Sequence, residues 1–176
     1  MAESHREIVL GAGCFWCTEA AYSMIPGVVS TMPGYAGGTT RDPSYEQVCT
    51  GSTGHAEVVR VEYDPVRISL ESLLDIFMTI HDPTSLNRQG GDVGTQYRSI
   101  IFYSDEEDHV RIDAYLRKVQ KEFSRPLVTE VRRLEAFYPA EEYHRQYFRQ
   151  HPTESYCRVV IAPKLKKVKK QVATKL

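Results

Sequence analysis

Short apolar runs, closed by glycine or proline, predict strands and helices in alternation along the chain. Residues 6–13 and 56–63 are rich in β-branched residues and predict strands, the first of which ends on glycines. Residues 14–24 and 70–80 predict helices, and the second of these follows Ser69, a good cap residue. The pattern therefore places both kinds of element in one chain.

The remaining pattern predicts further elements and one long loop. In chain order these are a strand at 28–32 with a loop at 33–38, a loop at 82–96, a strand at 99–103, a helix from a capping box at 104–107 to about 123, a strand at 128–137 and a helix at 141–150. A loop as long as the one at 82–96 is uncommon unless it is functional or disordered. The residues alone support a mixed α/β or α+β fold of two layers and no finer description.

Length and composition fit a single domain over residues 1–176, with a mobile C-terminal tail from about residue 152. Hydrophobic residues make up 41% of the chain and charged residues 26%, which is ordinary for a globular protein. Apolar runs stay well below the roughly 20 residues of a membrane span. The polar N-terminus shows no secretory signal, so we expect a cytoplasmic protein without a membrane partner, and we take it to be a monomer.

Charge is spread unevenly along the chain. Residues 164–176 hold 6 of the 22 basic residues and no acidic one, so residues 1–163 carry 16 basic and 23 acidic groups. An acidic body argues against nucleic acid as a partner. The lysine run itself predicts a solvated end of the chain.

Four cysteines are few for a disulfide-stapled secreted scaffold, and they indicate reactive thiols or metal ligands. Cys14 lies where a predicted strand passes into a predicted helix, and a helix N-terminus stabilises a thiolate. Phe15 and Trp16 follow it and belong either to the core or to the wall of an apolar pocket. Cys17 completes a Cys-x-x-Cys pair, which suits a redox dithiol or half of a zinc site. Cys49 is expected to pack as a small hydrophobe.

Two polar clusters follow. Glu57 is either a surface group or an acid held in an apolar site, where burial would raise its pKa and make it a proton donor. His55 is either the base of a Cys-His hydrolase or a loop histidine bonded to backbone. Residues 87–99 are polar and glycine-rich, but they lack the lysine and the helix context of a phosphate loop.

Together these clusters resemble the peptide methionine sulfoxide reductase A family. The matching pieces, in the family's order, are Gly13-Cys14-Phe15-Trp16, Thr53-Gly54-His55-Ala56-Glu57, His81-Asp82-Pro83-Thr84, Gln89-Gly90 and Gly94-Thr95-Gln96-Tyr97-Arg98-Ser99. The similarity covers roughly residues 7–150. It implies an α+β two-layer sandwich that resembles the ferredoxin-like arrangement, with a mixed sheet and long coil segments.

The resemblance also implies a reaction, the thiol-dependent reduction of the S epimer of methionine sulfoxide, in proteins and free, to methionine. Cys14 would attack the sulfur and Glu57 would protonate the oxygen. The implied substrate-binding residues are Phe15 and Trp16 around the methyl group, and Tyr45, Asp92 and Tyr97 at the oxygen. The family uses no metal and no organic cofactor, and its reductant is a thioredoxin.

The attack would leave Cys14 as a sulfenic acid, with which a second thiol can condense. The chain departs from the common family pattern here, because Cys17 stands where many members have glycine and the tail holds Cys157 alone. Both Cys157 and Cys17 are candidates for this resolving thiol. Access from a loosely held tail favours Cys157 over a sulfur one turn inside a helix.

Two other classes of function stay open at this point. A thiol–disulfide exchange protein would use Cys14 and Cys17 on protein disulfides, and a zinc-binding module would use them as ligands. Turnover of only one epimer of a methyl sulfoxide with dithiothreitol indicates the reductase. Reduction of insulin disulfides indicates the exchange protein, and tightly bound stoichiometric zinc indicates the module.

Overall fold

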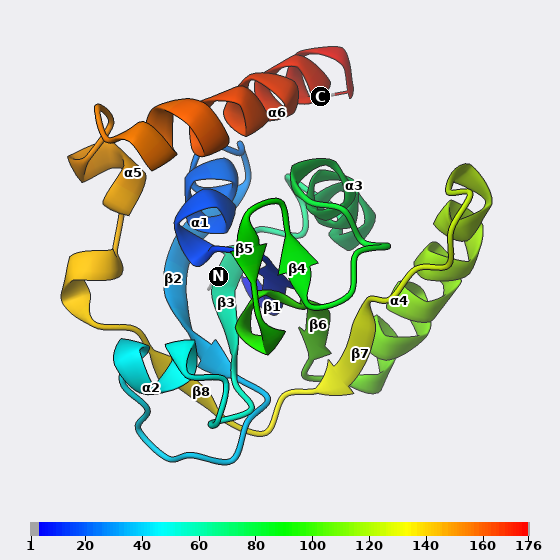
Figure 1. Cartoon of the computed structure of the whole chain (residues 1–176). Coiled ribbons are helices and arrows are strands. Elements are labelled where there is room, and N and C mark those ends of the chain that lie inside the picture. Colours follow the sequence, from blue (N-terminus) through cyan, green and yellow to red (C-terminus); the bar gives the residue numbers. More distant parts are fainter. Residues whose placement is uncertain (1–3, 176) are drawn as a thin grey trace.

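The computed structural model of the chain describes residues 4–175, which build a mixed sheet with helices packed against it (Figure 1). Six strands lie in the order β7-β6-β1-β3-β2-β8. Their bounds are β1 Arg6–Ala12, β2 Val28–Ala36, β3 Ala56–Tyr63, β6 Ser99–Tyr103, β7 Glu130–Arg133 and β8 Phe137–Pro139. Neighbouring strands are antiparallel except β6 and β7, which are parallel. A separate hairpin pairs β4 (Arg88–Gln89) with β5 (Asp92–Val93).

Helices cover one face of this sheet. They are α1 Phe15–Ser23, α2 Tyr45–Cys49, α3 Leu70–Ile80, α4 Glu106–Val119, α5 Tyr147–Gln150 and α6 Ala162–Lys175. Helices α1 and α3 pack on the sheet, and α6 lies across both of them (Figure 1). None of the helices within residues 4–175 has the length and apolar character that crossing a membrane needs.

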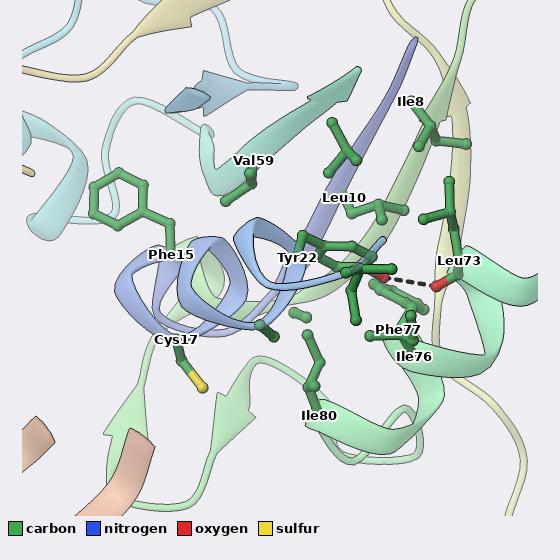
Figure 2. Packing of buried hydrophobic residues seen from close by; sticks show 14 of the residues in the cluster. Ile8, Leu10, Phe15, Cys17, Tyr22, Val59, Leu73, Ile76, Phe77 and Ile80 are labelled. Atoms are coloured by element: carbon green, nitrogen blue, oxygen red, sulfur yellow. Dashed lines mark hydrogen bonds between the residues drawn. The ribbon is translucent and has the colours of Figure 1, made fainter. Parts of the chain in front are cut away.

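The main hydrophobic core fills the space between these helices and the sheet. Leu10 and Val59 reach it from the two central strands, and both are fully buried. Tyr22 spans the core from α1 and donates a hydrogen bond of 2.7 Å to the carbonyl oxygen of Leu73 in α3 (Figure 2). On the opposite face of the sheet, Val9 belongs to a second and smaller cluster, as strand alternation requires. The central strands of the sheet are thus packed on both faces.

Several predicted elements are confirmed. The strands expected at 6–13, 56–63 and 99–103 correspond to β1, β3 and β6, and the helix at 14–24 corresponds to α1. The helix at 70–80 is α3, and the Ser69 side chain accepts a hydrogen bond from the backbone N–H of Ser72. These are the segments where apolar periodicity and local caps agree.

Other predictions were wrong in their bounds. Strand β2 continues through the expected loop at 33–38 as far as Ala36. The cap of α4 is Asp105, whose side chain accepts from the N–H of Asp108, and not the capping box that begins at Ser104. The single strand expected at 128–137 is two short strands, because β7 pairs with one edge of the sheet and β8 with the other. The loop at 82–96 contains the β4–β5 hairpin.

The helix expected at 141–150 is interrupted. A short 3₁₀ turn covers Glu142–His144, and α5 begins only at Tyr147. Gln146 between them has a φ of 52°, the left-handed region that ends regular helix. The buried Glu19 carboxylate holds this residue by accepting a 2.6 Å hydrogen bond from its backbone N–H. A contact from α1 therefore sets the break.

The segment after residue 152, expected to be loose, is packed in the structure. It forms a turn of π-helix at Cys157–Ile161 and continues as α6. Cys157 has no exposed surface, and Val168 lies in the main core. The lysine run is thus an amphipathic helix that buries its apolar face. The mobility of this segment stays a prediction.

Candidate active site

Cys14 sits at the point where the central strand β1 hands over to α1. Gly13 between them has a φ of 93°, which a side chain would strain, and a Cβ there would meet the Gln89 side chain at 3.0 Å. Cys14 is the N-cap residue of α1 and is half-buried. The strand-to-helix turn predicted from the sequence therefore presents its sulfur at the helix N-terminus.

Glu57 lies next to this turn, near the start of the adjacent strand β3. Its carboxyl is 1% exposed, and its Oε1 accepts a 3.2 Å hydrogen bond from the backbone N–H of Phe15. Its Oε2 is buried and has no hydrogen-bond partner among the described residues. Burial raises the pKa of Glu57 to about 8. The carboxyl is therefore neutral near pH 7 and has one oxygen available to donate a proton.

The thiol of Cys14 differs from our expectation of a resting thiolate. Burial and the adjacent Glu57 raise its pKa well above the ordinary value, while hydrogen bonds from the Trp16 N–H and the Tyr156 hydroxyl act in the opposite direction. The stabilisation at a helix N-terminus does not offset the loss of solvent. The resting site thus holds a proton on both the thiol and the acid.

Three polar residues expected at the sulfoxide oxygen gather around Glu57. Tyr45 begins α2, Tyr97 ends the 3₁₀ turn at Thr95–Tyr97, and Asp92 begins β5. Burial, followed by the nearby Glu57 charge, raises the pKa of both tyrosines, so their hydroxyls stay protonated donors. Elements far apart in sequence thus bring five of the expected groups into one site.

The two aromatic residues after Cys14 have different surroundings. Phe15 is fully buried, with its ring 5.7 Å from that of Tyr35 and 5.0 Å from that of His144. Trp16 is half-buried, and the Tyr147 ring stacks on it with centroids 3.7 Å apart and planes within 6°. Trp16 is therefore the more accessible of the two rings, while Phe15 lies behind it in the core.

Comparison with known proteins joins this geometry to a family. A family model described as "Peptide methionine sulfoxide reductase" matches residues 6–176. The chain belongs to the peptide methionine sulfoxide reductase family. It is 53% identical over 161 residues to the peptide methionine sulfoxide reductase MsrA of Saccharolobus solfataricus, covering 92% of this chain and 91% of that protein. Membership makes the chain an oxidoreductase and decides against a zinc module.

Solved structures agree with this assignment. Mxr1 from Saccharomyces cerevisiae in its reduced form is 37% identical and superposes with a TM-score of 0.83, covering 87% of this chain and 89% of that one. Mxr1 in complex with Trx2 is 26% identical, with a TM-score of 0.59 and coverage of 81% and 84%. The mixed α+β fold is therefore the fold of this reductase family.

Sequence reasoning missed three residues of the C-terminal segment that line the reductase site. His144 accepts a 2.9 Å hydrogen bond from the Trp16 indole N–H through its Nδ1. Tyr147 covers the Trp16 ring, and the Tyr156 hydroxyl donates to Asp92 at 2.7 Å. The several aromatic residues within 143–148 were the only sequence feature that indicated a role here, but this feature does not show against which strand end they pack.

Glu141 was also missed, and it holds Tyr45 in place. Its Oε2 accepts a 2.9 Å hydrogen bond from the Tyr45 backbone N–H, and its Oε1 accepts one of 3.0 Å from the Tyr35 hydroxyl. A surface-like glutamate before a predicted helix carries no sequence signal for this role. The carboxylate joins the start of α2 to the residues after β8.

Two expectations about single residues have clear outcomes. Cys49 does not pack as a small hydrophobe, because it is exposed at the end of α2. His55 is the loop histidine and not the base of a hydrolase. Its Nδ1 accepts from the Gly38 N–H at 3.0 Å, and its Nε2 donates to the Thr40 carbonyl oxygen at 2.7 Å. Both ring nitrogens are therefore occupied by backbone groups.

The two candidate resolving thiols are both buried. Cys17 is 2% exposed, and Cys157 has no exposed surface. The argument from access that favoured Cys157 therefore does not apply to this conformation. Cys17 lies within the first turn of α1, and its N–H donates to the Cys14 carbonyl oxygen at 3.2 Å.

Within residues 4–175, no group of three or more histidine, cysteine, aspartate and glutamate side chains converges in a metal-binding arrangement. Cys14 and Cys17 are instead surrounded by Glu57, Tyr156 and the C-terminal helix.

Proposed function

We propose that this chain reduces the S epimer of methionine sulfoxide, in proteins and as the free amino acid, with Cys14 as nucleophile and Glu57 as acid. One observation carries the proposal. Glu57 is a buried carboxyl with a pKa of about 8 and an unpartnered Oε2 among the described residues, next to a cysteine at a helix N-terminus. A sulfoxide oxygen leaves only when it is protonated, and this acid holds its proton near pH 7.

The reaction uses the groups that surround these two residues. Glu57 gives its proton to the sulfoxide oxygen as the sulfur of Cys14 attacks the sulfoxide sulfur, and the carboxylate left on Glu57 takes up the proton of the Cys14 thiol. The substrate S–O bond then breaks, and the hydroxyl group passes to the sulfur of Cys14. Tyr45 and Tyr97 donate hydrogen bonds to that oxygen, and Asp92 acts there directly or through water. The products are methionine and a sulfenic acid on Cys14, so the substrate sulfur is reduced and the cysteine is oxidised.

The methyl group of the substrate lies, in this proposal, against Trp16, with Phe15 behind it. Support comes from the half-buried indole, which is rigidly held by its hydrogen bond to His144. Because Tyr147 covers one face of that ring, the methyl group contacts the remaining face or displaces the tyrosine. An apolar wall of this kind selects a small alkyl group.

Regeneration completes the cycle. A second thiol, Cys157 or Cys17, condenses with the sulfenic acid and releases water, and a thioredoxin reduces the disulfide. The complex of the family member Mxr1 with Trx2 supports this reductant. The route through Cys157 requires movement of the packed tail, so the tail's mobility belongs to the proposal. A single catalytic domain, a monomeric state and a cytoplasmic location are also part of it.

The ferredoxin-like arrangement belongs to the proposal as well, for the four central strands. Their order β6-β1-β3-β2, with α1 between β1 and β2 and α3 between β3 and β6, supports it. This is the spatial order of a split β-α-β pair. The edge strands β7 and β8 are additions to that core.

The test is a single-turnover assay with each epimer of methionine sulfoxide and no added reductant. We expect methionine from the S epimer alone. Glu57→Gln slows that step by about 10²–10⁴-fold, because glutamine cannot supply the proton. The matched control is Glu62→Gln, at the far end of the same strand, where the rate stays at the wild-type value. Equal rates for the two variants would remove Glu57 from the chemistry.

An insulin-reduction assay run in parallel tests the remaining alternative. A chain that reduces insulin disulfides without producing methionine from either epimer is a thiol–disulfide exchange protein. The sulfoxide reductase instead gives one equivalent of methionine per Cys14 before any reductant is added.

A further inference from the structure

One lysine of the C-terminal run differs from its neighbours. Lys166 and Lys170 are exposed, as in a solubilising tail, and Lys167 is exposed at the rim of a cavity. Lys164 is half-buried on the inner side of the same helix. Its side chain lines a cavity of about 600 Å³ between α6 and the β4–β5 hairpin, together with Asp92. Partial burial of a charged lysine side chain costs free energy, and this cost indicates that an interaction with a neighbouring side chain compensates for it.

The partner is the thiol of Cys17. Figure 2 shows the Cys17 side chain leaving α1 on the side opposite to Phe15. Helix α6 packs against α1, and this places Lys164 near enough to the Cys17 thiol to lower its pKa through its charge and hydrogen bonding. The Cys-x-x-Cys pair at the start of α1 is therefore supplied with a cation from a helix about 150 residues away in sequence.

The geometry of the pair suits a disulfide. Residues three apart on a helix have Cβ atoms about 5–6 Å apart, so a small shift of the first turn brings the two sulfurs of Cys14 and Cys17 into bonding range. Cys14 is the N-cap residue, outside the regular turns, which makes that shift a local one. Cys157 lies in the same core cluster as Cys17, but on a separate turn of π-helix that packs against α1.

We propose that Lys164 is a positioning residue for the resolving step, and that it directs the thiol of Cys17 onto the sulfenic acid of Cys14. The Cys17 thiolate attacks the sulfur of the sulfenic acid, the S–O bond breaks, and an S–S bond forms. The leaving hydroxide takes up the proton released by Cys17 and departs as water. No external oxidant is needed, because the sulfoxide has already oxidised Cys14. The inference rests on the proposed reductase function and chooses between its two resolving cysteines.

The charges around Cys17 set the direction of the pH dependence. Burial raises its pKa, Lys164 lowers it, and Asp92 raises it slightly. Lys164 also faces His81, whose pKa burial lowers to about 4, so this ring is neutral at the pH of the reaction. Without the Lys164 ammonium, burial and Asp92 raise the pKa of Cys17 further, so the resolving step needs a higher pH.

The size of the effect follows from thiol reactivity. An opposite charge at a few ångströms shifts a pKa by about 1–3 units, and each unit cuts the thiolate fraction about tenfold. A more basic thiolate is also a better nucleophile, with a Brønsted slope near 0.5, so the net loss is about threefold per unit. We expect Lys164→Met to slow disulfide formation by about three- to thirtyfold.

The experiment follows one turnover of the full chain with the S epimer of methionine sulfoxide and no reductant. Methionine is counted, the sulfenic acid is trapped with dimedone at timed intervals, and the first disulfide is mapped by mass spectrometry. Lys164→Met keeps the aliphatic stem, Lys164→Arg keeps the charge, and Lys166→Met is the matched exposed control. Thermal melts verify that each variant is folded.

We expect one methionine per chain in all four proteins and a Cys14–Cys17 disulfide as the first product. In Lys164→Met the sulfenic acid lives longer, and the half-maximal pH of its decay rises by at least one unit. Lys164→Arg decays within threefold of wild type. A first-formed Cys14–Cys157 disulfide overturns the inference, as do equal lifetimes in Lys164→Met and Lys166→Met or an arginine variant as slow as the methionine one. Absence of the methionine burst from wild type overturns the reductase function itself.

Discussion

Two parts of the molecule meet at Cys14, and they are held in different ways. The nucleophile and the acid belong to the central strands β1 and β3, whose ladder pairs Leu10 with Val59. The C-terminal segment, residues 142–175, is held over them by the packing of its buried apolar side chains and by separate hydrogen bonds. Tyr156 donates to Asp92 at 2.7 Å, and the Thr79 hydroxyl donates to Gln171 at 2.6 Å.

This difference in how the two parts are held explains how a substrate can reach a buried site. A backbone ladder in the centre of a sheet breaks only with the fold, so Cys14 and Glu57 keep their geometry. Each polar contact of the C-terminal segment contributes only about 0.5–1.5 kcal/mol and can open without the others. We call strands β1 and β3 with Cys14 and Glu57 the sheet-built part, and residues 142–175 the cover. We therefore expect substitutions in the sheet-built part to affect the chemistry, and substitutions in the cover to affect access to Cys14.

The largest effect is expected from Cys14→Ser, in the sheet-built part. A serine hydroxyl is no thiolate-like nucleophile near pH 7, so the single-turnover yield of methionine falls below detection. Circular dichroism and the melting temperature stay close to wild type, because the half-buried sulfur contributes little to packing. Activity within tenfold of wild type would exclude Cys14 as the nucleophile.

Glu57→Gln is expected to stabilise the fold at high pH while it removes activity. The pKa of Glu57 rises on folding from 4.5 to about 8, so ionisation costs stability as pH climbs through that window. Above pH 8 the cost reaches about 5 kcal/mol, and below pH 4.5 it vanishes. Glutamine carries no such cost.

Denaturant unfolding of wild type and Glu57→Gln at pH 5, 7 and 9 checks this. The stability difference should widen in favour of the variant with each step, and the reduction rate of wild type should fall above pH 8. Parallel stability curves for the two proteins would mean that Glu57 ionises as a solvated group, which would also remove it as the acid.

Trp16→Ala tests the surface at which the two parts touch. Loss of the indole removes the apolar wall for the methyl group and the platform for Tyr147. We expect the preference for methyl over bulkier alkyl sulfoxides to fall by about 1–3 kcal/mol, measured as a ratio of kcat/KM values. An unchanged ratio in a folded variant would show that the selectivity resides elsewhere.

The smallest effect is expected from Tyr156→Phe, in the cover. It removes the hydroxyl that donates to Asp92 and acts on the Cys14 thiol, and it leaves the ring in place. Hydrogen exchange of residues 147–161 should accelerate about two- to tenfold, which corresponds to about 0.5–1.5 kcal/mol. The exposed Tyr143→Phe serves as control and should leave that exchange unchanged. Identical exchange in the two variants would contradict the separate-contact description of the cover.

Predictability from sequence differs between these parts for the same reason. Strands β1, β3 and β6 and helix α3 were predictable because the apolar periodicity of each element is visible in its own residues. The break at Gln146 was not, because a carboxylate from α1 imposes it. The division of 128–137 into β7 and β8 was not predictable either, since alternation within a strand does not say which sheet edge receives it.

The sequence by itself determined strands β1, β3 and β6, the family, and the motifs that carry Cys14, Glu57, Tyr45, Asp92 and Tyr97, because those depend on local pattern and residue type. The tertiary structure alone decided the ionisation of Cys14, which solvent exclusion sets against the helix N-terminus. It also decided the burial of Cys157 and the contact between Lys164 and Cys17. Burial and long-range contacts arise only when distant segments pack, and no window of sequence contains that information.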